Sequence, residues 1–166
     1  MADKTISERL QPSLLDRLTD SDPGEIKESR DLRVIDIRRL REIIQRDLSW
    51  LLNTSNNDSV IDAASYPNVV GSVLNYGVRE VAGDFSTAER AELIRMSIKR
   101  AIERFEPRIR EGSTDVELRY EEEDQNKTLV KFDIRADMWA QPLTMELYLR
   151  SEVDVTTGEL RLERGM

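Results

Sequence analysis

The triplet Glu106-Pro107-Arg108 is the most distinctive group of reactive side chains in this 166-residue sequence. It places a carboxylate and a guanidinium on backbone that proline has stiffened, after an expected helix and before the first expected strand. Such a pair suits a preorganised polar contact with a partner protein. The alternative is an ion pair within the chain that ties the end of the helix to the sheet.

Carboxylates are also the groups that glycoside hydrolases use, one of them as a general acid. Glu106 with Asp133 or Asp137 is a candidate pair of this kind. The chain has 33 acidic residues, so such pairs arise easily by chance, and both aspartates fall on the polar side of their expected strand. We therefore expect no catalytic residues.

Histidine and cysteine are both absent. Their absence excludes Ser/His and Cys/His nucleophiles, the commonest zinc ligands and the commonest general base near neutral pH. The acidic run Glu121–Asp124 lacks the alternating spacing and turn glycine of a calcium loop, so we expect a solvated hairpin tip there. No metal or organic cofactor is expected.

The net charge of −8 and the pI of about 4.8 argue against nucleic acid as a partner. Four arginines nevertheless cluster in one expected helix, where they form a solvated face or a basic face for an acidic protein: Arg38, Arg39, Arg41 and Arg46. The lack of cysteine, of any apolar run near 20 residues and of a signal-like amino terminus predicts a cytoplasmic protein without direct membrane insertion.

Helical periodicity dominates the first two thirds of the chain. Residues 1–31 are expected to form a mobile amino-terminal arm with one short helix around Leu14, Leu15 and Leu18, and residues 32–166 to form one domain. Within that domain we predict a helix over 32–53, a short helix over 69–77 closed by Gly77, and a third helix. The third helix begins at the capping box that Ser86 opens and ends before Pro107.

After Pro107 the apolar period changes to two, which predicts strands. Alternating runs cover 115–120, 130–138 and 145–149, the last extending to about Val155, and a short pair follows at Leu160 and Leu162. Helices followed by antiparallel strands indicate an α+β fold, with amino-terminal helices packed on a β-meander in a single domain. The edges of so small a sheet are expected to be open.

Several strings occur together in the order found in a known family. They are Leu14-Leu15-Asp16-Arg17-Leu18, Arg46-Asp47-Leu48, Trp50-Leu51-Leu52-Asn53-Thr54, Tyr66-Pro67, Ser72-Val73-Leu74-Asn75-Tyr76-Gly77 and Phe105-Glu106-Pro107-Arg108. The chain resembles the TssE family of type VI secretion baseplate proteins and the related wedge proteins of contractile phages. The resemblance spans Leu14 to Leu162; Val78-Arg79-Glu80 departs from the leucine, proline and acidic residue that many relatives have there.

The resemblance implies a structural role in assembly and no enzymatic activity. It implies partners among the wedge subunits TssF and TssG and the sheath proteins TssB and TssC, with TssK as a further candidate. It also implies that the domain is similar to the part of the sheath subunits that interlocks by strand exchange. The chain would then link the wedge to the contractile sheath and help to start sheath assembly.

The partner-binding residues we predict are Glu106, Pro107 and Arg108, with Leu14, Leu15, Leu18, Asn75 and Tyr76 as additional candidates. Trp50 and Trp139 fit either interface anchors or core packing. Two other functions stay open: a regulator of the same fold that binds one adaptor protein, and a muramidase, since some relatives have carried a lysozyme-like label.

Overall fold

The computed structural model describes residues 13–19, 23–24, 37–80, 88–119, 128–139 and 144–165. Some predicted features lie outside these ranges. They are the remainder of the amino-terminal arm, the first residues of the helix expected from Leu32, the capping residue Ser86, the acidic loop Glu121–Asp124 and the pair Gln141-Pro142.

Two long helices, α2 (Ile37–Leu52) and α4 (Ala88–Phe105), supply the helical half of the core. In each helix the apolar residues recur three and four apart, so they line one face. The buried residues of α2 are Leu40, Ile43, Ile44, Leu48, Leu51 and Leu52. Those of α4 are Ala91, Ile94, Ile98, Ala101 and Ile102. α4 ends two residues before Pro107, as predicted.

Four strands form one antiparallel sheet in the order β1-β2-β3-β4. They are β1 (Asp115–Arg119), β2 (Leu129–Met138), β3 (Met145–Asp154) and β4 (Leu160–Arg164). The alternating residues predicted to face the core are buried along β2 and β3, including Phe132, Ile134 and Leu149. The predicted α+β meander is therefore confirmed.

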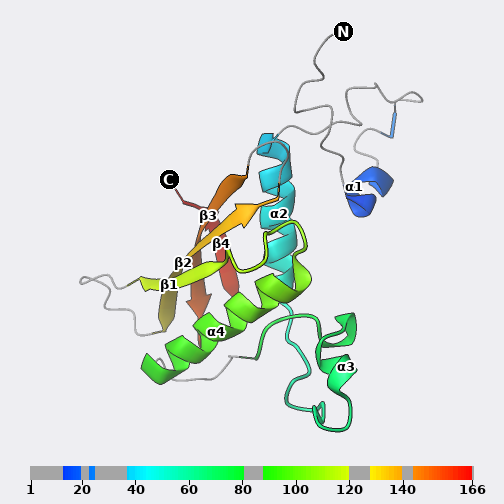
Figure 1. The fold of residues 1–166 in the computed structure, drawn as a ribbon. Coiled ribbons are helices and arrows are strands. Elements are labelled where there is room, and N and C mark those ends of the chain that lie inside the picture. Colours follow the sequence, from blue (N-terminus) through cyan, green and yellow to red (C-terminus); the bar gives the residue numbers. More distant parts are fainter. Residues whose placement is uncertain are drawn as a thin grey trace.

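The helices and the sheet make two layers around one core (Figure 1). α4 packs along β1 and against α2, and α2 packs on β4. The other face of the sheet carries polar side chains such as Lys131, Asp133 and Arg135. Among the described residues, no helix covers that face.

The two edge strands are less open than the sequence suggests, because helix side chains bond to them. Asn53, directly after α2, donates from Nδ2 to the Leu160 carbonyl oxygen at 2.8 Å and accepts from the Leu160 amide at 2.9 Å. Gln45 donates to the Leu162 carbonyl oxygen at 3.2 Å. On the opposite edge, Arg95 of α4 donates to the Val116 carbonyl oxygen at 3.2 Å.

The segment between α2 and α4 corrects one prediction. In place of one helix over 69–77 the chain forms α3 (Pro67–Val70) and a separate 3₁₀ turn, η3 (Val73–Asn75), because the backbone turns at Gly71 and Ser72. Residues 56–76, which we call the lobe, project from the two-layer body (Figure 1).

Gly77 closes the lobe with a positive φ of 122°, a conformation that glycine adopts readily. A Cβ at this position would lie 2.1 Å from the Thr54 carbonyl oxygen, which accepts a hydrogen bond from the Val78 amide. Gly77 therefore lets the two ends of the lobe meet.

Candidate partner-binding surface

Glu106 and Arg108 form an ion pair with each other across Pro107. Arg108 donates from Nε to Glu106 Oε1 at 2.6 Å and from Nη2 to Oε2 at 2.5 Å, and its amide donates to Oε1 at 3.1 Å. Glu106 is only 5% exposed, whereas the Arg108 side chain reaches the surface. The two side chains thus form an ion pair within the chain, and a partner can reach the pair mainly through Arg108.

Arg108 also reaches the long helix α2. Its Nη2 donates to Asp47 Oδ2 at 2.7 Å. Burial disfavours the charged form of Arg108, but the hydrogen bonds and charges of Glu106 and Asp47 outweigh this, so the pKa of Arg108 lies above its ordinary value. The triplet after α4 therefore forms one ion pair within itself and another with α2.

The alternation of charges continues along α2 to the short helix α1 (Leu14–Leu18). Arg46 donates to Asp47 Oδ1 at 2.7 Å and to Asp16 Oδ1 at 2.6 Å. The hydrogen bond from Arg46 lowers the pKa of Asp16, and the same bond raises the pKa of Arg46. Five side chains thus form a continuous ion-pair chain: Glu106, Arg108, Asp47, Arg46 and Asp16.

α1 is a five-residue helix with an unburied apolar edge. The Ser13 hydroxyl caps its first turn by accepting from the Asp16 amide at 3.4 Å. Leu14 and Leu18 are 71% and 74% exposed, Leu15 is half exposed, and no residue of α1 is buried. Because so short a helix is unstable alone, the ion pair of Asp16 with Arg46 helps to hold it against α2.

Two exposed tryptophans flank the ion-pair chain. The guanidinium of Arg46 lies over the Trp50 ring at 4.8 Å, and Trp50 is 51% exposed. At the other end, the Trp139 amide donates to the Arg108 carbonyl oxygen at 2.7 Å, and Trp139 is 64% exposed. Neither tryptophan belongs to the core. We call the set Leu14, Leu15, Leu18, Trp50, Trp139 and Arg108 the tryptophan face.

Asn75 and Tyr76 lie in the lobe and act within the chain. Asn75 is 2% exposed; its Oδ1 accepts from the Asn57 amide at 2.9 Å and its Nδ2 donates to Asp58 and to the Val70 carbonyl oxygen. The Tyr76 ring packs edge-on against Phe105 at 5.2 Å, and burial raises the pKa of its hydroxyl. A contribution of Asn75 to binding would act through the shape of the lobe.

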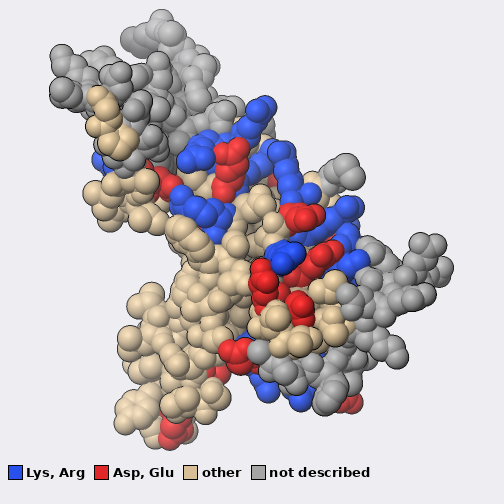
Figure 2. Space-filling model, turned by 180° about the vertical axis from the view of Figure 1, so that it is seen from behind, with Lys and Arg blue, Asp and Glu red and all other residues tan. Residues whose placement is uncertain are grey.

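The lobe carries exposed apolar residues that we did not predict from the sequence as binding residues. They are Val60, Tyr66, Val73 and Leu74. Figure 2 shows this part of the surface with few charged side chains, in contrast to the mixed charges over α2 and the sheet. A signal was present in the sequence, since two of these residues occur in the Ser72 to Gly77 string. Arg46 and Asp47 also occur in one of the strings, and neither was predicted as a binding residue.

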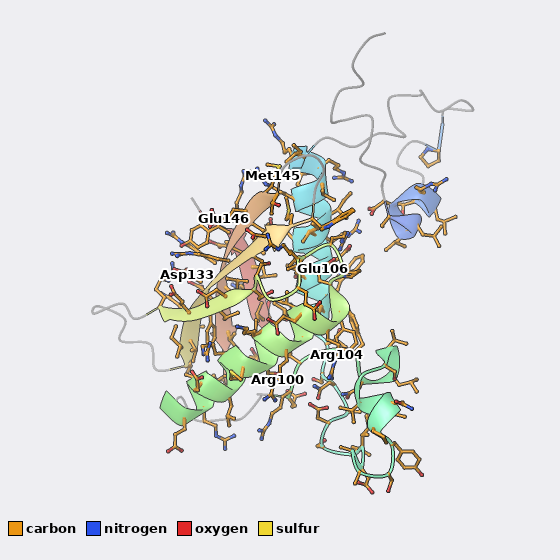
Figure 3. The ribbon with its side chains drawn as sticks, in the orientation of Figure 1. Arg100, Arg104, Glu106, Asp133, Met145 and Glu146 are labelled. Atoms are coloured by element: carbon orange, nitrogen blue, oxygen red, sulfur yellow. The ribbon has the colours of Figure 1, made fainter. Side chains whose placement is uncertain are left out.

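The hydrogen bonds of Glu106 argue against a hydrolase site. Both oxygens of Glu106 accept hydrogen bonds from Arg108, so neither is available to deliver a proton to a leaving group. Asp133 lies on the sheet, where it accepts from the Tyr148 hydroxyl at 3.1 Å, while Glu106 lies at the end of α4 (Figure 3). Within the described ranges there is no cluster of acidic side chains that fits a metal ion, and no helix long and apolar enough to cross a bilayer.

Comparison with known families agrees with the resemblance seen in the sequence. Residues 38–143 match the family model described as baseplate wedge protein gp25, which spans most of α2, the lobe, α4, β1 and β2. Neither a curated protein nor a solved structure matches the chain. The chain belongs to the family of gp25-like baseplate wedge proteins, the structural baseplate family that also contains TssE.

Proposed function

We propose that this chain is a wedge subunit of a type VI secretion baseplate, linking TssF and TssG to the contractile sheath and helping to start sheath assembly. The proposal includes the division into an amino-terminal arm, residues 1–31, and a wedge-like domain, residues 32–166. It also includes a cytoplasmic location, where the baseplate is assembled.

The observation that supports this proposal is that residues from separate strings of the resemblance meet in the ion-pair chain. Asp16, Asp47 and Arg108 come from three separate strings of the resemblance; Arg46 bonds to Asp16 and Asp47, and Arg108 bonds to Asp47. Exposed apolar side chains lie on the segments that these ion pairs join. Exposed tryptophans beside an arginine are typical of residues that contribute most to binding energy at protein interfaces.

In this proposal the tryptophan face receives the wedge partners TssF and TssG. Arg108 keeps part of its side chain accessible while Glu106 and Asp47 hold its geometry, so little entropy is lost when it binds. The lobe, with Asn75 at its centre and Tyr76 at its base, is a second apolar surface for the same partners or TssK. The sheet is the side proposed to meet the sheath proteins TssB and TssC.

Affinity purification of the tagged protein from its own cells, with mass spectrometry of the bound proteins, tests this proposal. We expect wild-type protein to recover TssF, TssG and sheath proteins, and Arg108→Glu to lose TssF and TssG. Arg100→Glu is the matched control, because Arg100 is an exposed arginine on α4 outside the tryptophan face.

A variant that does not disturb the buried Glu106 keeps this test informative if Arg108→Glu unfolds. Trp139→Ala removes an exposed side chain and is expected to reduce recovery of the wedge proteins as well. Recovery of one unrelated regulatory protein, without wedge proteins, would favour the adaptor-binding alternative and contradict the proposal. Peptidoglycan clearance that Glu106→Gln abolishes would favour the muramidase.

A further inference from the structure

A cavity of about 400 Å³ lies beyond the end of β4, between α2 and the first half of β3. β4 ends at Arg164, which pairs with Leu149 of β3, whereas β3 begins earlier, at Met145. The cavity is separate from the tryptophan face and from the lobe, because none of its lining residues belongs to either. We call it the arginine cavity.

Three guanidiniums from three elements converge on the arginine cavity. They belong to Arg41 of α2, Arg135 of β2 and Arg164 at the end of β4. Glu146 is the single acidic residue in the lining. The three arginines outnumber this one carboxylate, so the cavity has an excess of positive charge.

The positive charge in the cavity is not neutralised within the described part of the chain. Other arginines of this acidic protein pair with carboxylates, as Arg46 does at 2.6 Å and Arg108 at 2.7 Å. Among the described residues, no carboxylate lies within ion-pair distance of Arg41, Arg135 or Arg164. An anion is therefore the ligand whose charge complements the cavity.

Positive charge also extends along α2 outside the lining. Arg38 lies one turn before Arg41, on the same side of the helix. Figure 2 shows basic side chains gathered over α2 and the adjoining sheet. Clustered charge of one sign raises the local concentration of oppositely charged ligands.

One wall of the cavity is held in place by contacts within the chain. The Arg135 guanidinium lies over the Tyr148 ring at 5.4 Å, and the Tyr148 hydroxyl donates to Asp133 at 3.1 Å. Gly165 lies against the same ring, since a Cβ there would come within 2.1 Å of it. A fixed ring and a stacked guanidinium reduce the entropy lost when a ligand binds.

The directions and the size of the site favour phosphate groups over carboxylates. A carboxylate has two oxygens in one plane, which a single guanidinium can occupy, whereas the oxygens of a phosphate spread in three dimensions. Guanidiniums that arrive from three elements suit the second arrangement. The volume lies within the range of small-molecule pockets, roughly 300–1,000 Å³. Since a water molecule takes about 30 Å³ of liquid, the cavity has room for more than one phosphate.

We propose that the arginine cavity binds a small molecule that carries a diphosphate group. Arg41 holds the diphosphate from the side of α2, and Arg135 and Arg164 hold it from the side of the sheet. The Glu146 carboxylate repels the ligand and limits its affinity. The proposal rests on this cavity alone and is independent of the assignment to a secretion baseplate.

Calorimetric titration of the full chain with inorganic pyrophosphate at low salt tests the proposal, with inorganic phosphate and citrate for comparison. We expect pyrophosphate to bind at least tenfold more tightly than either, with an affinity that falls as salt is added. In NMR spectra the amides of Tyr148 and Gly165 should shift. ADP identifies the source of the diphosphate: tighter binding than pyrophosphate indicates an organic diphosphate, and weaker binding indicates the inorganic anion.

Two variants should change the affinity for pyrophosphate in opposite directions. Arg41→Gln combined with Arg164→Gln should weaken binding by roughly tenfold or more, because two of the three guanidiniums are lost. Glu146→Gln removes the repelling carboxylate and should tighten binding several-fold. A gain of affinity cannot result from loss of folding, so this variant keeps the test decisive if the double variant unfolds.

The matched control is the double variant Arg79→Gln with Arg100→Gln, which makes the same change in net charge. Both arginines are exposed and outside the lining of the cavity, and Arg100 lies well away from Glu146 in Figure 3. The control should bind pyrophosphate as the wild type does.

Three results would overturn the proposal. The first is citrate binding as tightly as pyrophosphate, and the second is equal weakening in the cavity variant and the control, since only net charge would then matter. The third is binding to phosphatidylglycerol vesicles without binding to pyrophosphate, which would assign the charge to a lipid surface.

Discussion

Arg108 and Asp47 lie 61 residues apart in the sequence, and their side chains meet at 2.7 Å. This contact fastens the turn after α4 to the middle of α2, and through Arg46 it extends to α1. The same guanidinium binds the buried carboxylate of Glu106. One residue therefore organises the elements that present the exposed leucines and tryptophans.

Replacing Arg108 by alanine should destabilise the fold, because Glu106 would stay buried without its partner. We expect the free energy of unfolding to fall by about 2 kcal/mol. Glu106→Gln keeps a polar side chain of the same shape and should cost less. Urea unfolding followed by circular dichroism measures both. Equal stability of Arg108→Ala and wild type would show that the ion pair contributes nothing to folding.

The docking of α1 should depend on pH through Asp16. Its pKa is lowered in the folded state, so the pairing energy is fully present above the ordinary value of 3.8 and is lost as pH falls through the lower folded value. Trp50 emission reports the change, since Arg46 contacts both Asp16 and the Trp50 ring. A Trp139→Phe background isolates the Trp50 signal.

In that background, Asp16→Asn should abolish the acid transition in Trp50 emission and leave its neutral-pH emission close to the acid form of the parent. An identical transition in the Asn variant would show that another group causes it.

Gly77 and Gly71 offer a matched pair for testing how the lobe closes. Gly77→Ala places a Cβ at positive φ, 2.1 Å from the Thr54 carbonyl oxygen, and should cost about 2 kcal/mol or more. Gly71→Ala meets nothing within 4 Å and adopts a helical φ, so it should be neutral or slightly stabilising. Thermal unfolding distinguishes them, and similar melting temperatures for both variants would contradict the account.

Asn75 should matter through hydrogen bonds within the lobe. Asn75→Ala removes acceptor and donor groups from three partners and should lower stability by about 2 kcal/mol. It should also speed hydrogen exchange of the Asn57 amide. Asn56→Ala is the control, since it removes only exposed side-chain bonds with Asp58 and its backbone amide still bonds to Val78. Normal Asn57 protection in Asn75→Ala would contradict the assigned role.

Local periodicity explains why the architecture was predictable. Ile44, Leu48 and Ile98 recur at helical spacing and Phe132 and Ile134 at strand spacing, and each burial pattern follows directly. The break in the lobe was not predictable in this way, because Gly71 and Ser72 act on backbone direction without changing the apolar pattern.

The candidate surface was only partly predictable for a different reason. Glu106 and Arg108 are close in sequence, so their pairing was foreseen as an alternative. The contact between Arg108 and Asp47 joins distant segments, and no local pattern encodes it. The exposure of Trp50 and Trp139 likewise depends on how α2 and β2 pack, so core and surface positions could not be separated from sequence.

The most direct test of the tryptophan face is the affinity of purified wild-type and variant chains for a purified complex of TssF and TssG. We predict that Trp50→Ala and Trp139→Ala each weaken binding by roughly tenfold or more while the chain stays folded. Leu93→Ala, an exposed apolar residue on α4 outside this face, should bind as the wild type does. Full affinity in both tryptophan variants would contradict the assignment of this surface to the wedge partners.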